Sequence, residues 1–335
     1  MLPSAQKRLL HDVLGAGGIT TEQSPDVTEQ RSSVLGVQLA QEFFVRGRQR
    51  GHAGSVREVI TIDEADREAT DFTWEATRCL PYPADVSDRV YPPVLLLTRG
   101  VFRLLGLRMS IEGAENIPAD GPAVLASNHV SYLDFTFCGY AARTSGRLVR
   151  FMAKEEVFRH RIAGPLMRGM HHIPVDRSAG SGAFRAALAA LKAGEVIGVF
   201  PEATISRSFM LKDFKPGAAR MAQAGNAPLV PMVVWGGQRI YTKGHPRDLS
   251  RGKAISIVVG EPLHPARAAD SAEVTGELRS RMSVLLDHVQ RNYPDGPSGP
   301  DDRWWLPAAM GGTAPTPEAA AALDAAESAP SDPAA

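Results

Sequence analysis

The sequence predicts an α/β fold in which a central, mostly parallel or mixed β-sheet is covered by helices on both faces. Between residues 90 and 293, short apolar runs alternate with longer amphipathic stretches, an order typical of strands joined by helices. The apolar runs are continuous, as expected of strands buried on both faces. With 335 residues, 44% of them hydrophobic, the chain can bury a large core.

Six segments are predicted to be strands and five to be helices. The strands are expected at 123–127, 148–153, 172–175, 196–200, 229–235 and 255–260. The helices are expected at 132–143, 161–170, 180–193, 216–225 and 271–292. In open α/β sheets, ligands bind beyond the carboxyl ends of the strands. Polar residues that follow these strands are therefore the first candidates for a functional site.

Three regions are expected along the chain. Residues 1–85 form an N-terminal extension, polar and acidic apart from one helical stretch at 33–47, and we expect it to be poorly structured. Residues 90–293 form the folded domain, and the Pro/Ala-rich tail at 294–335 is expected to be disordered. Trp304 and Trp305 in that tail are candidates to anchor at an interface or to cover an edge of the core. The first residues, MLPSAQKRLLHDVLG, lack the apolar stretch of a signal peptide.

The segment at 91–107, YPPVLLLTRGVFRLLGL, is the most apolar candidate for membrane contact. It is too short to cross a bilayer and is interrupted by Arg99 and Arg103. Its apolar residues fall near helical spacing after two prolines, which predicts a short helix. Such a helix can lie in the headgroup plane of a membrane, or it can be a core helix whose arginines reach out to water. Both interpretations stay open.

Composition limits the classes of function. The net charge is zero, so no global field favours a nucleic-acid partner. Residues 147–220 hold thirteen basic and six acidic side chains, a net of +7, which indicates either a local anionic ligand or an ordinary solvated face. Two cysteines in unrelated contexts exclude a disulfide framework and a cysteine-based zinc site.

One strand end carries a histidine and an aspartate. Asn128 and His129 directly follow the strand at 123–127, and Asp134 completes an H-x4-D pattern. Five positions on one helix would turn the two side chains well apart. They can meet if His129 is in a loop and Asp134 is in the first helical turn. The pair then resembles the base and its orienting carboxylate in a catalytic triad without a Ser or Cys nucleophile, so the nucleophile would be a hydroxyl of the substrate.

Two further strand ends carry polar residues. Glu202 and Thr204 follow the strand at 196–200, and Asp176 and Arg177 follow the strand at 172–175. Glu202 could equally cap the next turn, and an Asp-Arg pair is often a surface ion pair of little energetic weight. His171 and His172 are adjacent, so they cannot both face the same way in a strand. We therefore predict no metal site.

These motifs occur in a characteristic order. The order is Asn128-His129 with Asp134, then Ile173-Pro-Val-Asp-Arg177, then Phe200-Pro-Glu-Ala-Thr204, then Leu229-Val-Pro-Met-Val233. The set resembles the four motifs of the glycerolipid acyltransferase family, which includes the 1-acylglycerol-3-phosphate acyltransferases. The resemblance covers about residues 90–265 and extends to neither terminus.

The resemblance implies a division of roles among these residues. His129 would remove a proton from the acceptor hydroxyl, Asp134 would orient it, and the hydroxyl would attack an acyl thioester. Arg177 would bind the acceptor phosphate. Asn128, Glu202 and Thr204 would belong to the substrate-binding site. No cofactor is implied, because acyl-CoA or acyl-carrier protein enters as a co-substrate.

The third motif departs from the family pattern at two positions. Ala203 replaces the usual glycine, which is tolerable if the backbone there does not need a positive φ. Ile205 stands where the family has arginine, and isoleucine cannot bind a phosphate. Arg207, Lys212 and Lys215 are candidates to supply the missing charge.

We therefore expect a transferase of phospholipid biosynthesis that is peripheral on the cytoplasmic face of the cell membrane, with 91–107 as the candidate segment for attachment. It would acylate a lysophospholipid. The acceptor that we expect is 1-acylglycerol-3-phosphate, which would give phosphatidate. Another acceptor, such as glycerol-3-phosphate or another lysolipid, stays open. Two further alternatives also stay open. One is a hydrolase in which His129 activates water, and the other is a catalytically silent lipid-binding protein.

Overall fold

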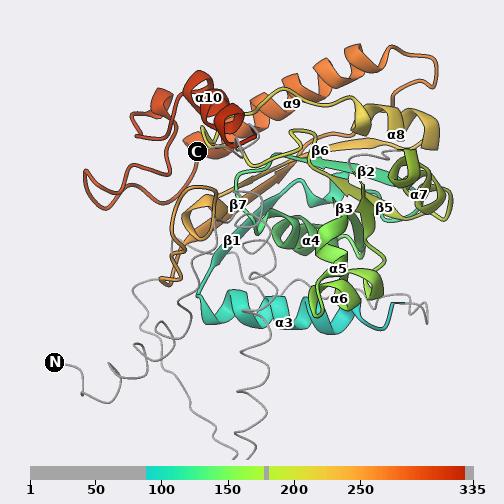
Figure 1. The fold of residues 1–335 in the computed structure, drawn as a ribbon, viewed down its shortest axis with the longest axis horizontal. Helices are drawn as coiled ribbons and strands as arrows, with labels where there is room; N and C mark the ends of the chain where they lie inside the picture. Colours follow the sequence, from blue (N-terminus) through green and yellow to red (C-terminus); the bar gives the residue numbers. More distant parts are fainter. Residues whose placement is uncertain (1–87, 177–180, 329–335) are drawn as a thin grey trace, which may run out of the picture.

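The computed structural model describes residues 88–176 and 181–328. The N-terminal extension expected at 1–85 lies outside the described residues. So does Arg177, the residue expected to bind the acceptor phosphate. Within the described chain, the predicted α/β fold is confirmed. A sheet of seven strands occupies the centre, with helices above and below it (Figure 1).

The strands match the predicted runs closely. Their order across the sheet is β1-β7-β6-β2-β5-β3-β4. All six predicted strands are present. Strand β1 at one edge is an addition, because its RMSIE sequence is too polar to signal a buried strand. The bounds are β1 Arg108–Glu112, β2 Ala123–Ser127, β3 Val149–Lys154, β4 Ile173–Val175, β5 Val196–Val199, β6 Leu229–Trp235 and β7 Ala254–Val259.

Strand direction decides where the site residues meet. β2 pairs in parallel with β5 on one side and with β6 on the other. β3 and β4 continue the parallel set, while β7 runs antiparallel to β6 and pairs in parallel with β1. The carboxyl ends of β5, β2 and β6 therefore lie side by side at one edge, which brings the first, third and fourth sequence motifs together.

Helices cover both faces of the sheet. Helices α7, α8 and α9 pack on one face, whereas α3 and α4 pack on the other (Figure 1). Successive residues of β2 point to opposite faces, so Val124 and Ala126 join the first layer while Ala123 and Leu125 join the second. The bounds are α3 Tyr91–Leu104, α4 Asp134–Thr144, α5 Glu155–Arg159, α6 Ala163–Gly169, α7 Ser181–Lys192, α8 Gly217–Gly225, α9 Ser271–Arg291 and α10 Pro317–Ser328.

Helix α3 has one packed side and one exposed side. Tyr91 is buried against Phe158 of α5 and Met167 of α6, and Phe102 is buried against α4. The exposed side presents Leu96 at 72% exposure and Leu104 at 43%. Among the described residues, no helix combines the length and apolar character needed to cross a bilayer. The helix is thus part of the core on one side and carries exposed leucines on the other.

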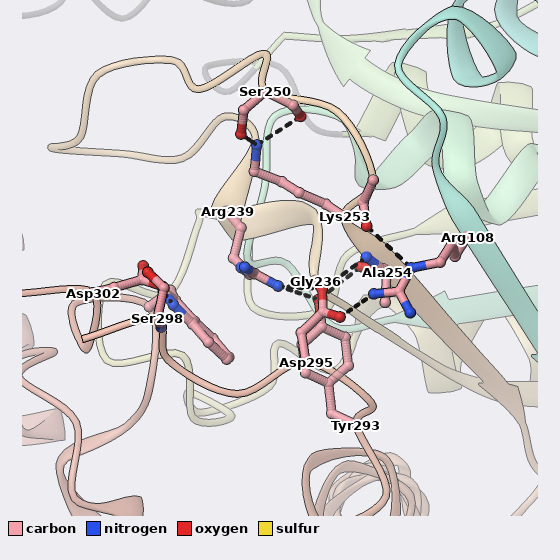
Figure 2. Close-up of polar contacts among 12 residues, drawn as sticks. Arg108, Gly236, Arg239, Ser250, Lys253, Ala254, Tyr293, Asp295, Ser298 and Asp302 are labelled. Atoms are coloured by element: carbon pink, nitrogen blue, oxygen red, sulfur yellow. Dashed lines mark hydrogen bonds and ion pairs between the residues drawn. The ribbon is translucent and has the colours of Figure 1, made fainter.

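The C-terminal region differs from the disordered tail that its composition predicts. Residues 294–328 are described, and they include helix α10. Asp295 accepts hydrogen bonds from the Ala254 N–H at 3.0 Å and from Arg108 and Arg239 (Figure 2). The Tyr293 hydroxyl, just ahead of the tail, donates to the Ala254 carbonyl at 2.7 Å. These contacts hold the chain against the start of β7.

Trp305 is the apolar anchor of this region. Its side chain is 1% exposed, its Nε1–H donates to Asp302 at 3.1 Å, and the Arg239 guanidinium lies 4.5 Å from its ring centroid. The alternative that Trp305 covers a core edge is therefore the one observed. Low-complexity composition obscured this because a few anchors suffice to order a segment whose other residues are small and polar.

We expect Trp305→Ala to lower the free energy of unfolding by about 3–5 kcal/mol, because it opens a cavity beneath the C-terminal segment. Trp304→Ala is the matched control, since that neighbouring ring is only half-buried and stacks on His245. Urea unfolding of both variants measures the difference. A loss below about 1 kcal/mol for Trp305→Ala would show that the segment is not part of the core.

Candidate active site

His129 and Asp134 meet in the arrangement that their spacing predicts. His129 lies in the loop after β2, and Asp134 is the first residue of α4. The His129 Nδ1 and Asp134 Oδ2 atoms are 2.9 Å apart. The ring nitrogen that faces away from the carboxylate, Nε2, is therefore the one presented to another molecule.

The Asp134 carboxylate is fixed by the loop that it orients. Oδ2 also accepts the backbone N–H groups of Val130 at 2.7 Å and Ser131 at 2.8 Å. The side chain is fully buried. Burial raises the pKa of Asp134 above its ordinary value, while the hydrogen bond and charge of His129 and the two N–H groups oppose that rise. The carboxylate thus sets both the loop conformation and the histidine orientation.

An aromatic ring supports the histidine from one side. The Phe200 ring stacks on the His129 imidazole with centroids 4.3 Å apart and planes inclined by 19°. The His129 side chain keeps 20% of its surface exposed. The imidazole is therefore held in orientation by Asp134 and Phe200 while it remains accessible from outside.

Glu202 connects two backbone segments of the site. Its Oε1 accepts the His129 N–H at 2.9 Å, and its Oε2 accepts the Lys212 N–H at 3.0 Å. Burial raises the pKa of Glu202 to about 7, although these two N–H groups stabilise the charged form. The sequence places Glu202 in the acceptor site, whereas each carboxylate oxygen in the structure accepts a backbone N–H.

Asn128 differs from the substrate-binding role that the sequence predicts. Its Nδ2 donates to the Val234 carbonyl at 3.0 Å, and its Oδ1 accepts the Val234 N–H at 2.7 Å. The residue is 1% exposed. Because both the NH2 group and the oxygen of the amide are hydrogen-bonded to one residue of β6, Asn128 joins the ends of β2 and β6.

Ala203, in the turn after β5, does not meet the condition under which alanine was expected to replace glycine without cost. Its φ is +63°, so the backbone at this position does adopt the left-handed conformation that favours glycine, at a cost of about 1–2 kcal/mol for an L-residue. Thr204 is half-buried, and Ile205 is buried in the turn, so neither supplies a cation. The Ser206 N–H donates to the His129 carbonyl at 2.8 Å. This bond brings the turn against the loop between β2 and α4 that carries His129, which we call the histidine loop.

Two of the three candidate cations lie together, and a third cation joins them. Arg207 and Lys212 share the acidic side chains of helix α10 with Lys243, whose position after β6 carries no motif that could have identified it. We refer to Arg207, Lys212 and Lys243 as the basic cluster. Lys215 is exposed just before α8 and is not part of these contacts.

The adjacent histidines face different environments. His172 is buried, its Nδ1 accepts the Phe151 N–H at 3.1 Å, and burial lowers its pKa to about 3. His171 is exposed and lies 3.7 Å from Asp88. In the part of the chain that the structure describes, no three His, Cys, Asp or Glu side chains gather in a way that could hold a metal ion.

Comparisons with known proteins show which family this chain resembles. The Acyltransferase family model matches residues 108–235, which include the histidine loop and the turn after β5. The computed fold resembles the crystal structure of the 1-acyl-sn-glycerophosphate acyltransferase of Thermotoga maritima, with a TM-score of 0.53 at 22% identity, covering 61% of this chain and 81% of that one. The family model is that of the acyltransferases, and the structural likeness extends to the fold.

Sequence relatives narrow the family. The 1-acyl-sn-glycerol-3-phosphate acyltransferase of Bacillus subtilis is 32% identical over 200 residues, covering 56% of this chain and 94% of that protein. A chloroplastic 1-acyl-sn-glycerol-3-phosphate acyltransferase of Arabidopsis thaliana is 30% identical over 184 residues, which is 54% of this chain and 49% of that protein. The chain belongs to the 1-acyl-sn-glycerol-3-phosphate acyltransferase family.

Proposed function

We propose that this acyltransferase moves a fatty acyl group from acyl-CoA or acyl-carrier protein to the free hydroxyl of 1-acylglycerol-3-phosphate, producing phosphatidate for phospholipid biosynthesis. The observation that carries the proposal is the oriented pair of His129 and Asp134, with Nε2 of the histidine facing away from the carboxylate. The named activity of the Bacillus subtilis relative supports this choice of acceptor.

In the proposed mechanism, His129 Nε2 removes the proton of the acceptor hydroxyl as its oxygen attacks the thioester carbonyl. Asp134 keeps the Nδ1 proton in place and stabilises the imidazolium that forms. The new C–O bond forms, the C–S bond breaks, and the proton on His129 passes to the departing thiolate. The products are the acylated acceptor and a free thiol, without a change in oxidation state.

Nearby hydroxyl and thiol groups support direct transfer over an acyl-enzyme. The Ser131 hydroxyl donates to the Tyr241 carbonyl at 2.7 Å, and the Ser206 hydroxyl donates to the Met210 carbonyl at 2.6 Å. Cys138 is fully buried, and burial raises the pKa of its thiol. These groups are committed or inaccessible, so the acceptor hydroxyl is the nucleophile that the site favours.

We expect His129→Ala to reduce acceptor-dependent thiol release from acyl-CoA by about 10³-fold, because it removes the general base. His288→Ala, at an exposed position on α9, is the matched control and should behave like the unaltered protein. The measurement follows free thiol with lysophosphatidate, with glycerol-3-phosphate, with another lysolipid, and with no acceptor.

Each alternative gives a different result in this assay. Thiol release without acceptor would identify a hydrolase, and release with another acceptor alone would replace lysophosphatidate in the proposal. Absence of turnover with any acceptor or either donor, together with lipid binding, would identify a silent lipid-binding protein. Equal rates for His129→Ala and the unaltered protein would exclude His129 as the base.

We propose further that Glu202 acts as a positioning residue for His129 and not as an acceptor ligand. Support comes from its two hydrogen bonds, which join the backbone of His129 to that of Lys212. A glutamine at this position would turn an NH2 group toward one of the two N–H donors, leaving that donor unpaired.

Glu202→Gln is therefore expected to lower kcat by about ten- to a hundredfold, in the range of a loss of about 1–3 kcal/mol, with KM for the acceptor nearly unchanged. Steady-state kinetics over a range of acceptor concentrations separates the two constants, and thermal melting verifies that the variant is folded. A raised KM with an intact kcat would instead assign Glu202 to the acceptor site.

The exposed side of α3 supports peripheral attachment to the cytoplasmic face of the membrane. Leu96 and Leu104 are exposed on this helix next to Arg99 and Arg103, which are exposed as well. Leucines flanked by arginines suit a helix that lies at the boundary between headgroups and acyl chains. Such attachment would bring the site to its lipid acceptor.

We expect the protein to float with phosphatidylglycerol vesicles, and the double variant Arg99→Glu/Arg103→Glu to float several-fold less, because anionic lipid repels the new charges. The charge-matched control is Arg185→Glu/Arg220→Glu, on helices α7 and α8 of the other layer. Equal flotation of the α3 variant and the unaltered protein would remove this helix from the membrane interface.

A further inference from the structure

Helix α10 places two carboxylates on the basic cluster. Asp324 Oδ1 lies 3.2 Å from Arg207 Nε and 3.2 Å from Lys243 Nζ, and its Oδ2 lies 2.6 Å from Lys212 Nζ. Glu327 Oε2 lies 2.9 Å from Arg207 Nη2 and 2.5 Å from Lys243 Nζ. Three residues apart, the two acidic side chains share one face of the helix.

The basic cluster is attached to the histidine loop through neighbouring residues. The Ser206 N–H, just before Arg207, donates to the His129 carbonyl at 2.8 Å. The Thr242 hydroxyl, just before Lys243, donates to the Val130 carbonyl at 2.6 Å. The cations therefore stand beside the loop that carries the proposed base.

The cluster is charged and largely shielded from water. The Lys243 side chain is 9% exposed and that of Arg207 is 17% exposed, and three cations face two carboxylates. Burial alone would raise the pKa of Asp324 and of Glu327, but the contacts with Lys212, Lys243 and Arg207 outweigh it, and both pKa values lie below their ordinary range. Cations grouped this closely are costly to bury without an anion, so the cluster needs an anionic partner.

Helix α10 is held mainly by these charges. Of residues 317–327, only Ala320 is buried, and the sole leucine, Leu323, is 47% exposed. A helix of 12 residues is marginal on its own. Because little apolar surface secures it, an anion with higher affinity for the cluster can displace it.

We propose that Arg207, Lys212 and Lys243 form the binding site for the acceptor's phosphate group, and that helix α10 occupies this site as an internal competitor until the acceptor displaces it. This inference rests on the proposed function, whose acceptor carries a phosphate monoester. Asp324 and Glu327 together supply two negative charges, close to the −1.5 to −2 of such a group at neutral pH. The cluster also supplies the charge that Ile205 cannot.

The test compares binding of glycerol 3-phosphate, as the headgroup probe, to full-length variants by calorimetry. Asp324→Asn/Glu327→Gln should bind the probe about tenfold more tightly than the unaltered protein and show a similarly lower KM for lysophosphatidate. The reason is that the ligand no longer has to displace the carboxylates of α10 from the basic cluster. Lys243→Gln should bind about tenfold more weakly. Glu318→Gln, at the exposed start of α10, is the matched control and should leave both unchanged.

A second readout follows α10 itself. By reciprocity, glycerol 3-phosphate should accelerate hydrogen exchange in residues 317–328 of the unaltered protein. Unchanged or weaker binding by Asp324→Asn/Glu327→Gln, or unchanged exchange in α10, overturns the inference while lysophosphatidate turnover still stands. Tighter binding by that variant without turnover of any acceptor overturns the proposed function and leaves the competitor site in place.

Discussion

The buried carboxylate of Asp134 is the constraint on which the rest of the site depends. One of its oxygens receives the His129 ring and the N–H groups of Val130 and Ser131. These donors come from successive residues of one loop, so the loop can take only a narrow range of conformations while all three bonds persist. In a fully buried position the loss of any donor is expensive. The orientation of the imidazole is therefore set by the fold before a substrate arrives.

The side chains of the motif residues around this pair form hydrogen bonds mainly with backbone groups. Asn128 joins the end of β2 to β6, and Glu202 joins the turn after β5 to the histidine loop. Both stand where parallel strands end side by side, and there the chain must turn without ladder hydrogen bonds. Polar side chains supply the missing partners. The position of His129, the proposed general base, thus depends on residues that hold its loop in place.

The charge beside the histidine loop has a different origin. Arg207 and Lys212 belong to the segment after β5, and Lys243 follows β6, while their anionic partners come from α10, near the C-terminal end of the described chain. The cations are shielded enough to need a partner, yet α10 has little apolar surface with which to hold its place. The position of α10 therefore depends on ion pairs between segments that are distant in the sequence.

The sequence by itself determined the α/β class, the six main strands and the pairing of His129 with Asp134, because hydrophobic periodicity and spacing along one loop are local properties. It also located the turn after β5, although not the positive φ of Ala203. The tertiary structure alone decided that Asn128 and Glu202 bind backbone groups, that Trp305 orders a segment of low complexity, and that Lys243 joins Arg207 and Lys212. The physical reason is that such contacts join residues distant in sequence, and their partners are fixed only when strands and helices pack.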